Sequence, residues 1–598
     1  MNFNDFNLNK NDYLYLGLLF LFICALSYRL MDFQMSGGMY SPDECLYLIS
    51  AMKYAGLDFY NICDVNDLFF TPVVSFLTSL LLRCGLDGHF SISFVSLIFG
   101  IFSILGMYVL LKYRFDSLLC LTGSILFGSF STFLLNYASG LIDIPGVAVS
   151  IWMVIFGLMA IDKNPKYFYL LFPLCAFGFF TRYTSIFVVP AIFLYYLIKK
   201  DVIKLVDIWI NDKHLFKKIA LTYFKSAELK CIISSMIITV ILTFLFCKFT
   251  LFDYNAPLRF FEHSISTLHV SNQVSNAIDF NSGKLYYLKG FDNNFLFGFN
   301  RDFNFQLRYT LFLIIFGGLA FKLINILLNL GKFNSFKSSY KTKYFNIFLM
   351  IILVISTILS FIESKFYLNH LISNIFLIIS LITFFSLIKQ FNINEEVQSL
   401  NLMMFALFCI YFIFISIYPI KTYRYAIPFL PSIVYFVIYG LDSILHSFSF
   451  GLNSEKLKSS ENGSANYSYA KWTKIIPILL ILILLCSTFS YIAFWKIEEN
   501  PVPSIEHIND KGYVNDLVNI TEYVKSNDPD YHSKTFGCYD HPTRMIRYYL
   551  QTNVTISDDD NKVLDSSNVD YIIINDKVDF KNYEKLYRCG EYFLYSHN

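Results

Sequence analysis

Charged side chains are scarce in this sequence. Aspartate, glutamate, lysine and arginine make up 15% of the 598 residues and hydrophobic residues 55%, whereas soluble proteins usually carry about 25% charged residues. The mean hydropathy is +0.50. So little charge cannot cover so much apolar side chain in water, so the composition excludes an ordinary soluble domain. The net charge of +2 gives no indication of nucleic-acid binding.

Paired cysteine motifs are also missing. None of the 12 cysteines forms a CxxC pair, and most lie in apolar runs, where a cysteine is typically a small core residue. Cys538 and Cys589 lie instead in the polar C-terminal segment and could form a disulfide there, which their spacing alone does not decide. The first apolar run, residues 13–31, lacks a clear small-residue cleavage site. We therefore expect it to be a retained membrane helix.

Long apolar runs recur from Tyr13 to Trp495, and several approach the ~20 residues that cross a hydrocarbon core. The sequence thus predicts a polytopic α-helical membrane protein with about 13 transmembrane helices. The predicted spans are 13–31, 90–111, 117–136, 144–161, 167–180, 183–198, 231–250, 309–330, 345–362, 367–388, 401–418, 424–445 and 475–495. One helix across 167–198 would be about 48 Å long, too long for a bilayer, so we expect a tight turn at Thr181-Arg182.

Lysine gathers in alternate loops. With the N-terminus inside, the segments 199–230, 331–344 and 446–474 lie inside and carry lysines, whereas 136–143 and 363–366 lie outside and nearly lack lysine and arginine. This agrees with the positive-inside rule. The odd number of spans then places the polar C-terminal segment outside a cell membrane.

The chain divides into a transmembrane domain, 1–495, and a small extracytoplasmic α/β domain, 496–598. The first contains two long outer loops, 32–89 and 251–308, and a short apolar stretch, 71–82, that we expect to lie along the membrane surface. In the second domain, hydrophobic patterning predicts one helix and three strands. The predicted elements are Tyr513–Lys525 and then Lys534–Cys538, Tyr571–Ile574 and Tyr592–Tyr595. The second domain contains no visible catalytic motif.

An acidic pair opens the first outer loop, in the segment 40–44 with the sequence Tyr-Ser-Pro-Asp-Glu. Ser41 and Glu44 fit a helix capping box, with Pro42 at the first helical position. A carboxylate at a helix N-terminus is also held rigidly and kept ionised, as a general base must be. Asp43 can therefore belong to the capped first turn of a helix and also act as a general base.

Asp143 precedes an apolar span in the motif Asp143-Ile144-Pro145. An ionisable group at membrane depth is a candidate functional residue, but the position also fits a helix N-cap. The sequence leaves both interpretations open.

Basic residues lie at the same predicted outer face: Arg182, Lys421 and Arg424. The positive-inside rule makes them less expected there. Arginine binds phosphate oxygens in a bidentate manner and lysine as a compact charge, although single cations also extend routinely to lipid headgroups. Tyrosine follows each arginine, which favours a functional site. His263 and His269 fit no strong zinc pattern, so a divalent metal is possible but not required.

Taken in order, these motifs resemble the membrane glycosyltransferases of the GT-C fold. The closest likeness is to the group of polyprenyl- or dolichyl-phosphate-mannose protein mannosyltransferases and aminoarabinose transferases. The matching residues are Asp43-Glu44, Asp143-Ile144-Pro145, Thr181-Arg182-Tyr183 and Arg424-Tyr425. Each motif is short, and the resemblance rests on their order and common sidedness over nearly the whole chain. One departure is Thr71-Pro72, because relatives often carry a basic residue before this proline.

The resemblance implies an inverting transfer of a mannose-like hexose, or a related sugar, from a polyprenyl- or dolichyl-phosphate donor. The acceptor would be a protein, a lipid or a glycan on the outer face of the membrane. Asp43, with Glu44, would activate the acceptor hydroxyl, and Asp143 would position the acceptor or support the base. The resemblance also assigns residues to phosphate binding, namely Arg182, Lys421 and Arg424, and to substrate contact, namely Tyr47 and Tyr425.

Three other functions are consistent with the sequence. A transporter or flippase for a lipid-linked sugar would place its polar groups near the bilayer midplane, whereas the candidate residues here lie at predicted span ends. A surface-polysaccharide polymerase or ligase would use the arginines but not the acidic pair. A sensor would depend on ligand binding by the segment after residue 500.

Overall fold

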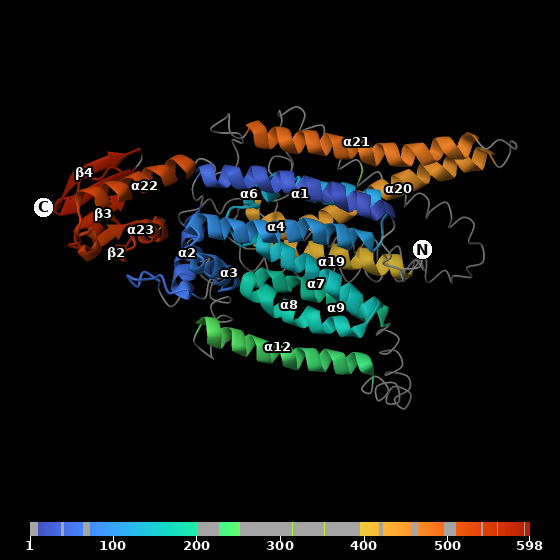
Figure 1. Ribbon diagram of the computed structural model, residues 1–598, viewed down its shortest axis with the longest axis horizontal. Coiled ribbons are helices and arrows are strands. Elements are labelled where there is room, and N and C mark those ends of the chain that lie inside the picture. The colour runs from blue at the N-terminus through green and yellow to red at the C-terminus, as the bar shows by residue number, and fades with distance from the viewer. Residues whose placement is uncertain are drawn as a thin grey trace.

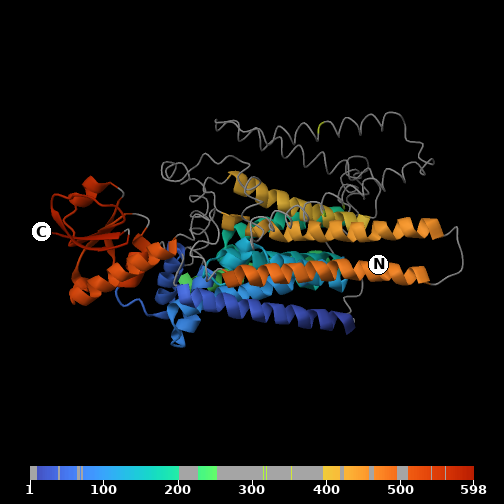
Figure 2. The same ribbon diagram turned by 90° about the horizontal axis from the view of Figure 1, so that it is seen from above.

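The computed structural model describes the chain in several segments. The described residues are 10–37, 41–63, 68, 72–200, 226–251, 314, 318, 352, 395–417, 423–456, 464–494, 510–539, 542–558, 560–590 and 592–597. Figure 1 shows long helices that lie roughly along one axis, with a small α/β unit beyond one end of them. Figure 2, turned by 90°, shows the same separation.

Up to residue 494, the described residues fold mainly into helices. They are α1 (Lys10–Gly37), α2 (Pro42–Ala55), α3 (Pro72–Arg83), α4 (Gly88–Lys112), α5 (Ser117–Gly128), α6 (Ser131–Asn136), α7 (Asp143–Asp162), α8 (Phe168–Thr181), α9 (Val188–Lys199), α12 (Ala227–Leu251), α19 (Glu395–Ile417), α20 (Leu430–Lys456) and α21 (Ser464–Phe494). Short 3-10 helices precede three of them: η2 (Pro165–Tyr167), η3 (Tyr183–Phe187) and η6 (Tyr423–Phe429).

Five segments of the described helices are long and apolar enough to cross a membrane. They lie at Asp12–Met35, Gly88–Lys112, Asp143–Asp162, Ala227–Lys248 and Arg424–Leu445. Each coincides with a predicted span, which confirms the membrane character of the chain. The predicted spans 309–330, 345–362 and 367–388 lie outside the described residues, as does the predicted outer loop 251–308 beyond α12.

The structure corrects three predicted boundaries. The span 117–136 is two helices, because Phe130 takes an extended conformation (ψ 131°) between α5 and α6. The predicted inner loop 446–474 is largely helical, because α20 continues to Lys456 and α21 begins at Ser464. The span 424–445 begins as the 3-10 helix η6, which contains Pro428.

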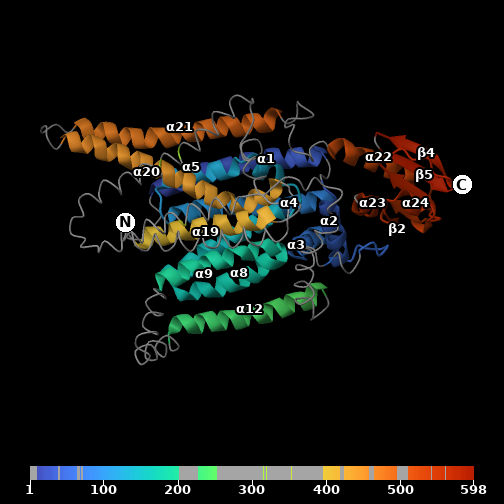
Figure 3. The same ribbon diagram turned by 180° about the vertical axis from the view of Figure 1, so that it is seen from behind.

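The predicted break near Arg182 is present. Arg182 is extended (φ −158°, ψ 115°), so α8 ends at Thr181 and η3 begins at Tyr183. Both α8 and α9 are shorter than a bilayer-spanning helix. The helix α12 packs beside α8, and Figure 3 shows it along one side of the bundle.

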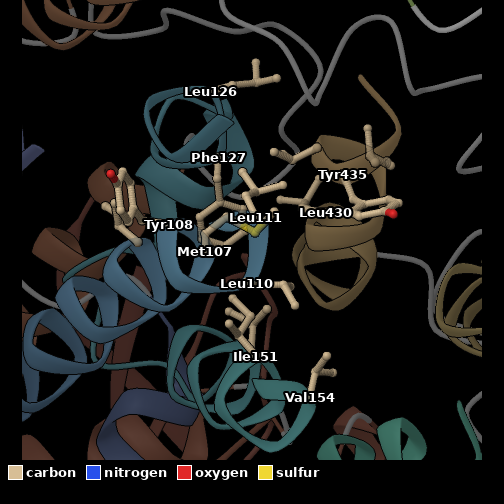
Figure 4. Packing of buried hydrophobic residues seen from close by; sticks show 14 of the residues in the cluster. Met107, Tyr108, Leu110, Leu111, Leu126, Phe127, Ile151, Val154, Leu430 and Tyr435 are labelled. Carbon is tan, nitrogen blue, oxygen red and sulfur yellow. The ribbon is translucent and has the colours of Figure 1, made fainter. Parts of the chain in front are cut away.

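A continuous apolar core joins the bundle helices. Figure 4 shows part of it, where side chains of α4, α5, α7 and α20 meet. The labelled residues are Met107, Tyr108, Leu110, Leu111, Leu126, Phe127, Ile151, Val154, Leu430 and Tyr435. Nearly all are fully buried, so the core fixes how the helix ends lie relative to one another.

A buried ion pair ties α1 to α4 at the end of the bundle away from the α/β unit. The Lys112 ammonium lies 2.8 Å from the Asp12 carboxylate, which also accepts a hydrogen bond from Ser117. Asp12 is fully buried. Because α4 starts at Gly88 beside Tyr548 of the α/β unit, its C-terminal lysine lies at the opposite end.

In the described residues of the C-terminal α/β unit there are five strands, three α-helices and the short 3-10 helix η7 (Tyr531–Ser533). In chain order the strands and α-helices are α22 (Asp510–Asn527), β1 (Phe536–Cys538), α23 (Thr543–Leu550), β2 (Val554–Ser557), α24 (Asn561–Asp565), β3 (Tyr571–Ile574), β4 (Tyr583–Cys589) and β5 (Tyr592–His597). The sheet order is β2-β1-β3-β5-β4; β1 pairs in parallel with β2 and β3, and β5 pairs antiparallel with β3 and β4. The central strands β1 and β3 are almost wholly buried, as expected for parallel strands covered on both faces.

Cys538 and Cys589 are not bonded to each other. Cys538 ends β1 and Cys589 ends β4, and two strands lie between them. Neighbouring strands lie about 4.8 Å apart, whereas a disulfide requires Cα atoms within about 7 Å. The disulfide that the sequence left open is therefore not formed.

The α/β unit packs directly on the bundle. Leu46 and Leu48 of α2 share one buried cluster with Met545, Ile546 and Leu550 of α23. The apolar face of α23 therefore covers α2, and the polar N-terminal turn of α23 lies beside the N-terminal turn of α2.

Candidate functional site

The N-terminus of α2 holds the acidic pair. Ser41 is the N-cap, and its hydroxyl accepts a hydrogen bond from the backbone N–H of Asp43 at 3.2 Å. Pro42 occupies the first helical position, where its missing N–H costs nothing. Ser41 is thus an N-cap, but its hydroxyl bonds Asp43 and not Glu44 as the predicted capping box requires. The cap fixes the backbone from which the Asp43 carboxylate projects.

The Asp43 carboxylate is held by two guanidinium groups from distant parts of the chain. Nη2 of Arg424 lies 2.7 Å from its Oδ2 atom, and Nη1 of Arg544 lies 2.7 Å from its Oδ1 atom. Arg424 belongs to η6 and Arg544 to α23 of the α/β unit. The Asp43 side chain keeps 25% of its surface exposed. It is therefore oriented on both oxygens and still accessible.

Glu44 takes a different direction from Asp43. Successive residues of an α-helix point about 100° apart, and Glu44 is fully buried. Its charge acts on Cys45 and on Tyr549 of the α/β unit. Of the predicted acidic pair, only Asp43 thus faces the accessible part of the site.

Tyr47 lies one helical turn after Asp43 and is 5% exposed. Burial, and then the negative charge of Asp43, raise the pKa of Tyr47 well above its usual value. The charges of Arg424, Asp143 and Arg544 also act on this phenol. Tyr47 therefore lies between the charged groups as a neutral hydroxyl.

Asp143 pairs with Arg182. The Asp143 carboxylate begins α7 and contacts the Arg182 guanidinium, and both side chains are more than nine-tenths buried. Ile142 occupies the N-cap position, and Asp143 makes no capping hydrogen bond. The N-cap interpretation of Asp143 is therefore wrong, because its carboxylate is engaged in an ion pair across two helices.

The ring of Tyr425 lies between the two arginines. The guanidinium carbon of Arg182 is 5.5 Å from the ring centroid and that of Arg424 is 5.4 Å from it. Cations at this distance from an aromatic face are attracted to it. Tyr425 thereby links the Asp143–Arg182 pair to the Asp43–Arg424 pair in one cluster.

A pocket that opens to solvent adjoins this cluster, and about 330 Å³ of space, open solvent included, lies against its walls. Its walls are mostly apolar or aromatic, and the Arg182 guanidinium provides a cation. The lining residues are Arg182, Tyr183, Thr184, Tyr411, Phe414, Ile415, Tyr425 and Pro428. Such a pocket suits a ligand with an apolar body and an anionic group.

Some predicted site residues lie outside the described residues. These are Lys421 and the histidine pair His263 and His269. Among the residues that the structure describes, no group of three or more His, Cys, Asp or Glu side chains could hold a metal ion. Asp43 and Asp143 are each paired with arginine.

Nothing in the sequence indicates that Arg544 belongs to this cluster, because it is 501 residues from Asp43. One local signal existed. Arg544 and Arg547 lie three residues apart, and therefore project from one face of a helix. That helix was not predicted.

The cluster combines the carboxylates of Asp43 and Asp143 with three arginines and adjoins a pocket with mostly apolar walls. Two guanidinium groups beside one carboxylate stabilise its charged form. An accessible carboxylate can take a proton, and preorganised arginines can stabilise negative charge as it develops. Together, these groups can support the transfer of a group from a phosphate to a hydroxyl.

Comparison with known proteins gives one family match. Residues 70–225 match the family model described as dolichyl-phosphate-mannose-protein mannosyltransferase. This segment contains Asp143 and Arg182. The resemblance to membrane glycosyltransferases is thereby confirmed. No curated protein matches the chain.

Two solved structures are similar to this chain at low identity. ArnT from Cupriavidus metallidurans, bound to undecaprenyl phosphate, is 11% identical over 97% of this chain and 98% of that chain, with a TM-score of 0.48. The archaeal oligosaccharyltransferase AglB from Archaeoglobus fulgidus, in complex with an inhibitory peptide and a dolichol-phosphate, is 12% identical over 94% of this chain and 70% of that chain, with a TM-score of 0.44.

Proposed function

We propose that this chain is a membrane glycosyltransferase that moves a sugar from a polyprenyl-phosphate donor to an acceptor hydroxyl. The observation that carries the proposal is the single cluster in which Tyr425 links the Asp43–Arg424 and Asp143–Arg182 pairs beside the pocket. The family match over residues 70–225 supports the same reaction class.

The pocket receives the lipid phosphate in this proposal. The aromatic and apolar walls take the first isoprene units, and Arg182 takes a phosphate oxygen. Arg182 is held by the Asp143 carboxylate, so it enters the reaction already oriented. Arg424 uses one of its five N–H donors on Asp43, which leaves other donors for the phosphate.

Transfer follows from this placement. Asp43 accepts the proton of the acceptor hydroxyl, and the hydroxyl oxygen bonds to the anomeric carbon of the sugar. The bond between that carbon and the phosphate oxygen breaks, and the lipid phosphate leaves with the electron pair. Attack from the face opposite the phosphate inverts the anomeric configuration. Arg182 and Arg424 stabilise the charge that develops on the phosphate.

The sugar is a mannose-like hexose or a related sugar, and the acceptor is a protein, a lipid or a glycan. The site lies at the extracytoplasmic ends of the helices. Supporting this orientation, α4 and α9 have lysine in their last turns, at the end of the bundle away from the site, where the positive-inside rule expects it. The α/β unit is then extracytoplasmic as well.

Proteoliposomes that contain the protein test this function. They receive a panel of radiolabelled polyprenyl-phosphate sugars and extracted acceptors, and the label is followed into a covalent product. We expect inverted transfer from at least one donor. Label that moves between leaflets without a covalent product would instead indicate a flippase and overturn the proposal.

The two ends of α7 provide a matched pair of variants. Asp143 opens the helix and pairs with Arg182, whereas Asp162 closes it and lies 3.6 Å from the Lys199 ammonium. We expect Asp143→Asn to lower transfer by about 10²-fold or more and Asp162→Asn to preserve it. Equal effects in both variants would show a general loss of helix packing and would contradict the assigned site.

A further inference from the structure

Arg544 of the α/β unit contacts the Asp43 carboxylate. Its guanidinium donates to Oδ1 at 2.7 Å while Arg424 donates to Oδ2 at 2.7 Å. The Arg544 side chain is 38% exposed and that of Asp43 25%. The contact therefore lies at the accessible rim of the site.

The helix that carries Arg544 is firmly placed on the bundle. On α23, the Arg547 guanidinium donates to the backbone carbonyl of Ile62, and Met545 and Ile546 are fully buried against α2. Beyond α23, the Asn553 amide donates to the Asn61 carbonyl at 3.2 Å. These contacts hold α23 in place without touching Asp43, so docking and the Asp43 contact can be separated by mutation.

Two donors on opposite oxygens restrict the Asp43 carboxylate more than one donor can. With Arg424 alone, the carboxylate can still turn about its side-chain bonds. With a second donor on Oδ1, turning breaks at least one charge-assisted hydrogen bond. A general base must hold its oxygen within hydrogen-bond reach of the acceptor proton, so this restriction bears directly on the transfer step.

We infer that Arg544 is a positioning residue for the transfer reaction, and that the C-terminal α/β unit completes the active site. This inference rests on the proposed function. Arg544 acts through Asp43: it fixes the carboxylate from the side opposite Arg424 and stabilises its ionised form. The α/β unit is accordingly required for the rate of the chemical step and not only for folding or acceptor capture.

The test is a kinetic comparison of full-length variants in proteoliposomes. Arg544→Ala removes the contact, Arg544→Gln keeps a neutral donor, and Arg544→Lys keeps the charge. Arg547→Ala removes a docking contact on the same helix. Arg588→Ala serves as the surface control, because Arg588 contacts Gly590 and the Phe593 ring, away from α2.

We expect Arg544→Ala to lower kcat by about 10- to 100-fold and to leave the KM of the donor within about threefold. Arg544→Lys recovers part of the loss, and Arg588→Ala has no effect. Melting temperatures separate folding from function: a kcat loss without a lower melting temperature supports the inference. Where Arg544→Ala does not fold, Arg544→Gln decides the same question.

The pH dependence of kcat is a second readout, which a purely structural role would not change. The charged and titratable groups beside Asp43 include Arg424 of η6, Arg544 of α23, Tyr47, Cys45 and Glu44 of α2, and Asp143 of α7. Removal of the Arg544 cation beside the Asp43 carboxylate should move the acid limb of the profile to higher pH in Arg544→Ala.

The outcomes distinguish the inference from the proposed function. If the wild type transfers sugar and Arg544→Ala keeps its kcat and pH profile, the inference is overturned while the function stands. A raised donor KM with unchanged kcat would make Arg544 a phosphate ligand and would also overturn it. If the wild type transfers no sugar from any donor, the proposed function fails, and the inference with it.

Discussion

Gly146 lies where the Arg182 side chain crosses α7, and a single methyl group there should disturb the site. A Cβ atom at Gly146 would be 2.8 Å from Cδ and 3.0 Å from Cβ of Arg182. Carbon atoms pack best at about 3.5–4.0 Å, so Arg182 must shift by roughly 0.5–1 Å in Gly146→Ala. The Cβ of Arg182 is bonded to its backbone, so a change of rotamer alone does not relieve the overlap.

This shift moves the guanidinium away from both Asp143 and the pocket. A misplacement of about 1 Å can lower a rate by about 10²-fold. We therefore expect kcat/KM for the polyprenyl-phosphate sugar to fall by about 10- to 100-fold in Gly146→Ala. The assay is initial-rate transfer of labelled sugar in proteoliposomes at several donor concentrations.

Gly157→Ala is the matched control. A Cβ atom there would be 2.8 Å from Cγ2 of Ile192, the same overlap in the same helix but against an apolar side chain of α9. Both variants gain about 1 kcal/mol of helix propensity and lose a similar amount to overpacking. Wild-type kcat/KM in Gly146→Ala, or an equal loss in both variants, would refute the role of Arg182.

Three further predictions concern the cluster, the bundle and the α/β unit. Tyr425→Leu removes the ring between the two arginines and should weaken binding of labelled polyprenyl phosphate by about tenfold, whereas Tyr425→Phe keeps the ring and the affinity. Lys112→Met removes the ammonium that balances the charge of the buried Asp12 carboxylate and should destabilise the bundle by about 3 kcal/mol, measured by unfolding in detergent. Hydrogen bonds from Thr535 lower the pKa of Asp570. The ionised Asp570 therefore stabilises the folded α/β unit at neutral pH, and this contribution is lost as the pH falls below about 4. Hydrogen exchange of β1 and β3 should show this acid dependence in the wild type and not in Asp570→Asn.

The helical part of the fold was largely predictable, because membrane helices are set by the local length and apolarity of the chain. The break at Arg182 also followed from length alone. The division of 117–136 did not, because the chain leaves the helix at Phe130, and no proline or charge marks that position. In the α/β unit, β3 had the predicted bounds, but α23 was missed because its eight residues are mostly polar or aromatic.

The site was predicted in part. Asp43 and Arg424 were expected at the same face of the membrane, and they form an ion pair. The different directions of the Asp43 and Glu44 side chains could have been inferred, since successive residues of a helix point about 100° apart. The ion pair of Asp143 with Arg182 could not be predicted. An aspartate at the start of a helix is compatible both with an N-cap and with an ion pair to another helix, so the sequence does not distinguish the two. The position of Arg544 could not be predicted, because it depends on how the α/β unit packs on the helix bundle.

In the proposed mechanism, Asp43 is the base of the sugar transfer. This role is decided by the single-turnover rate of sugar transfer from bound, labelled donor in wild type and in Asp43→Asn. The amide has the shape of the carboxylate but cannot take the proton. We predict that Asp43→Asn binds the polyprenyl-phosphate sugar at least as tightly as the wild type and transfers the sugar about 10²- to 10⁴-fold more slowly. Transfer at the wild-type rate in Asp43→Asn would contradict the claim.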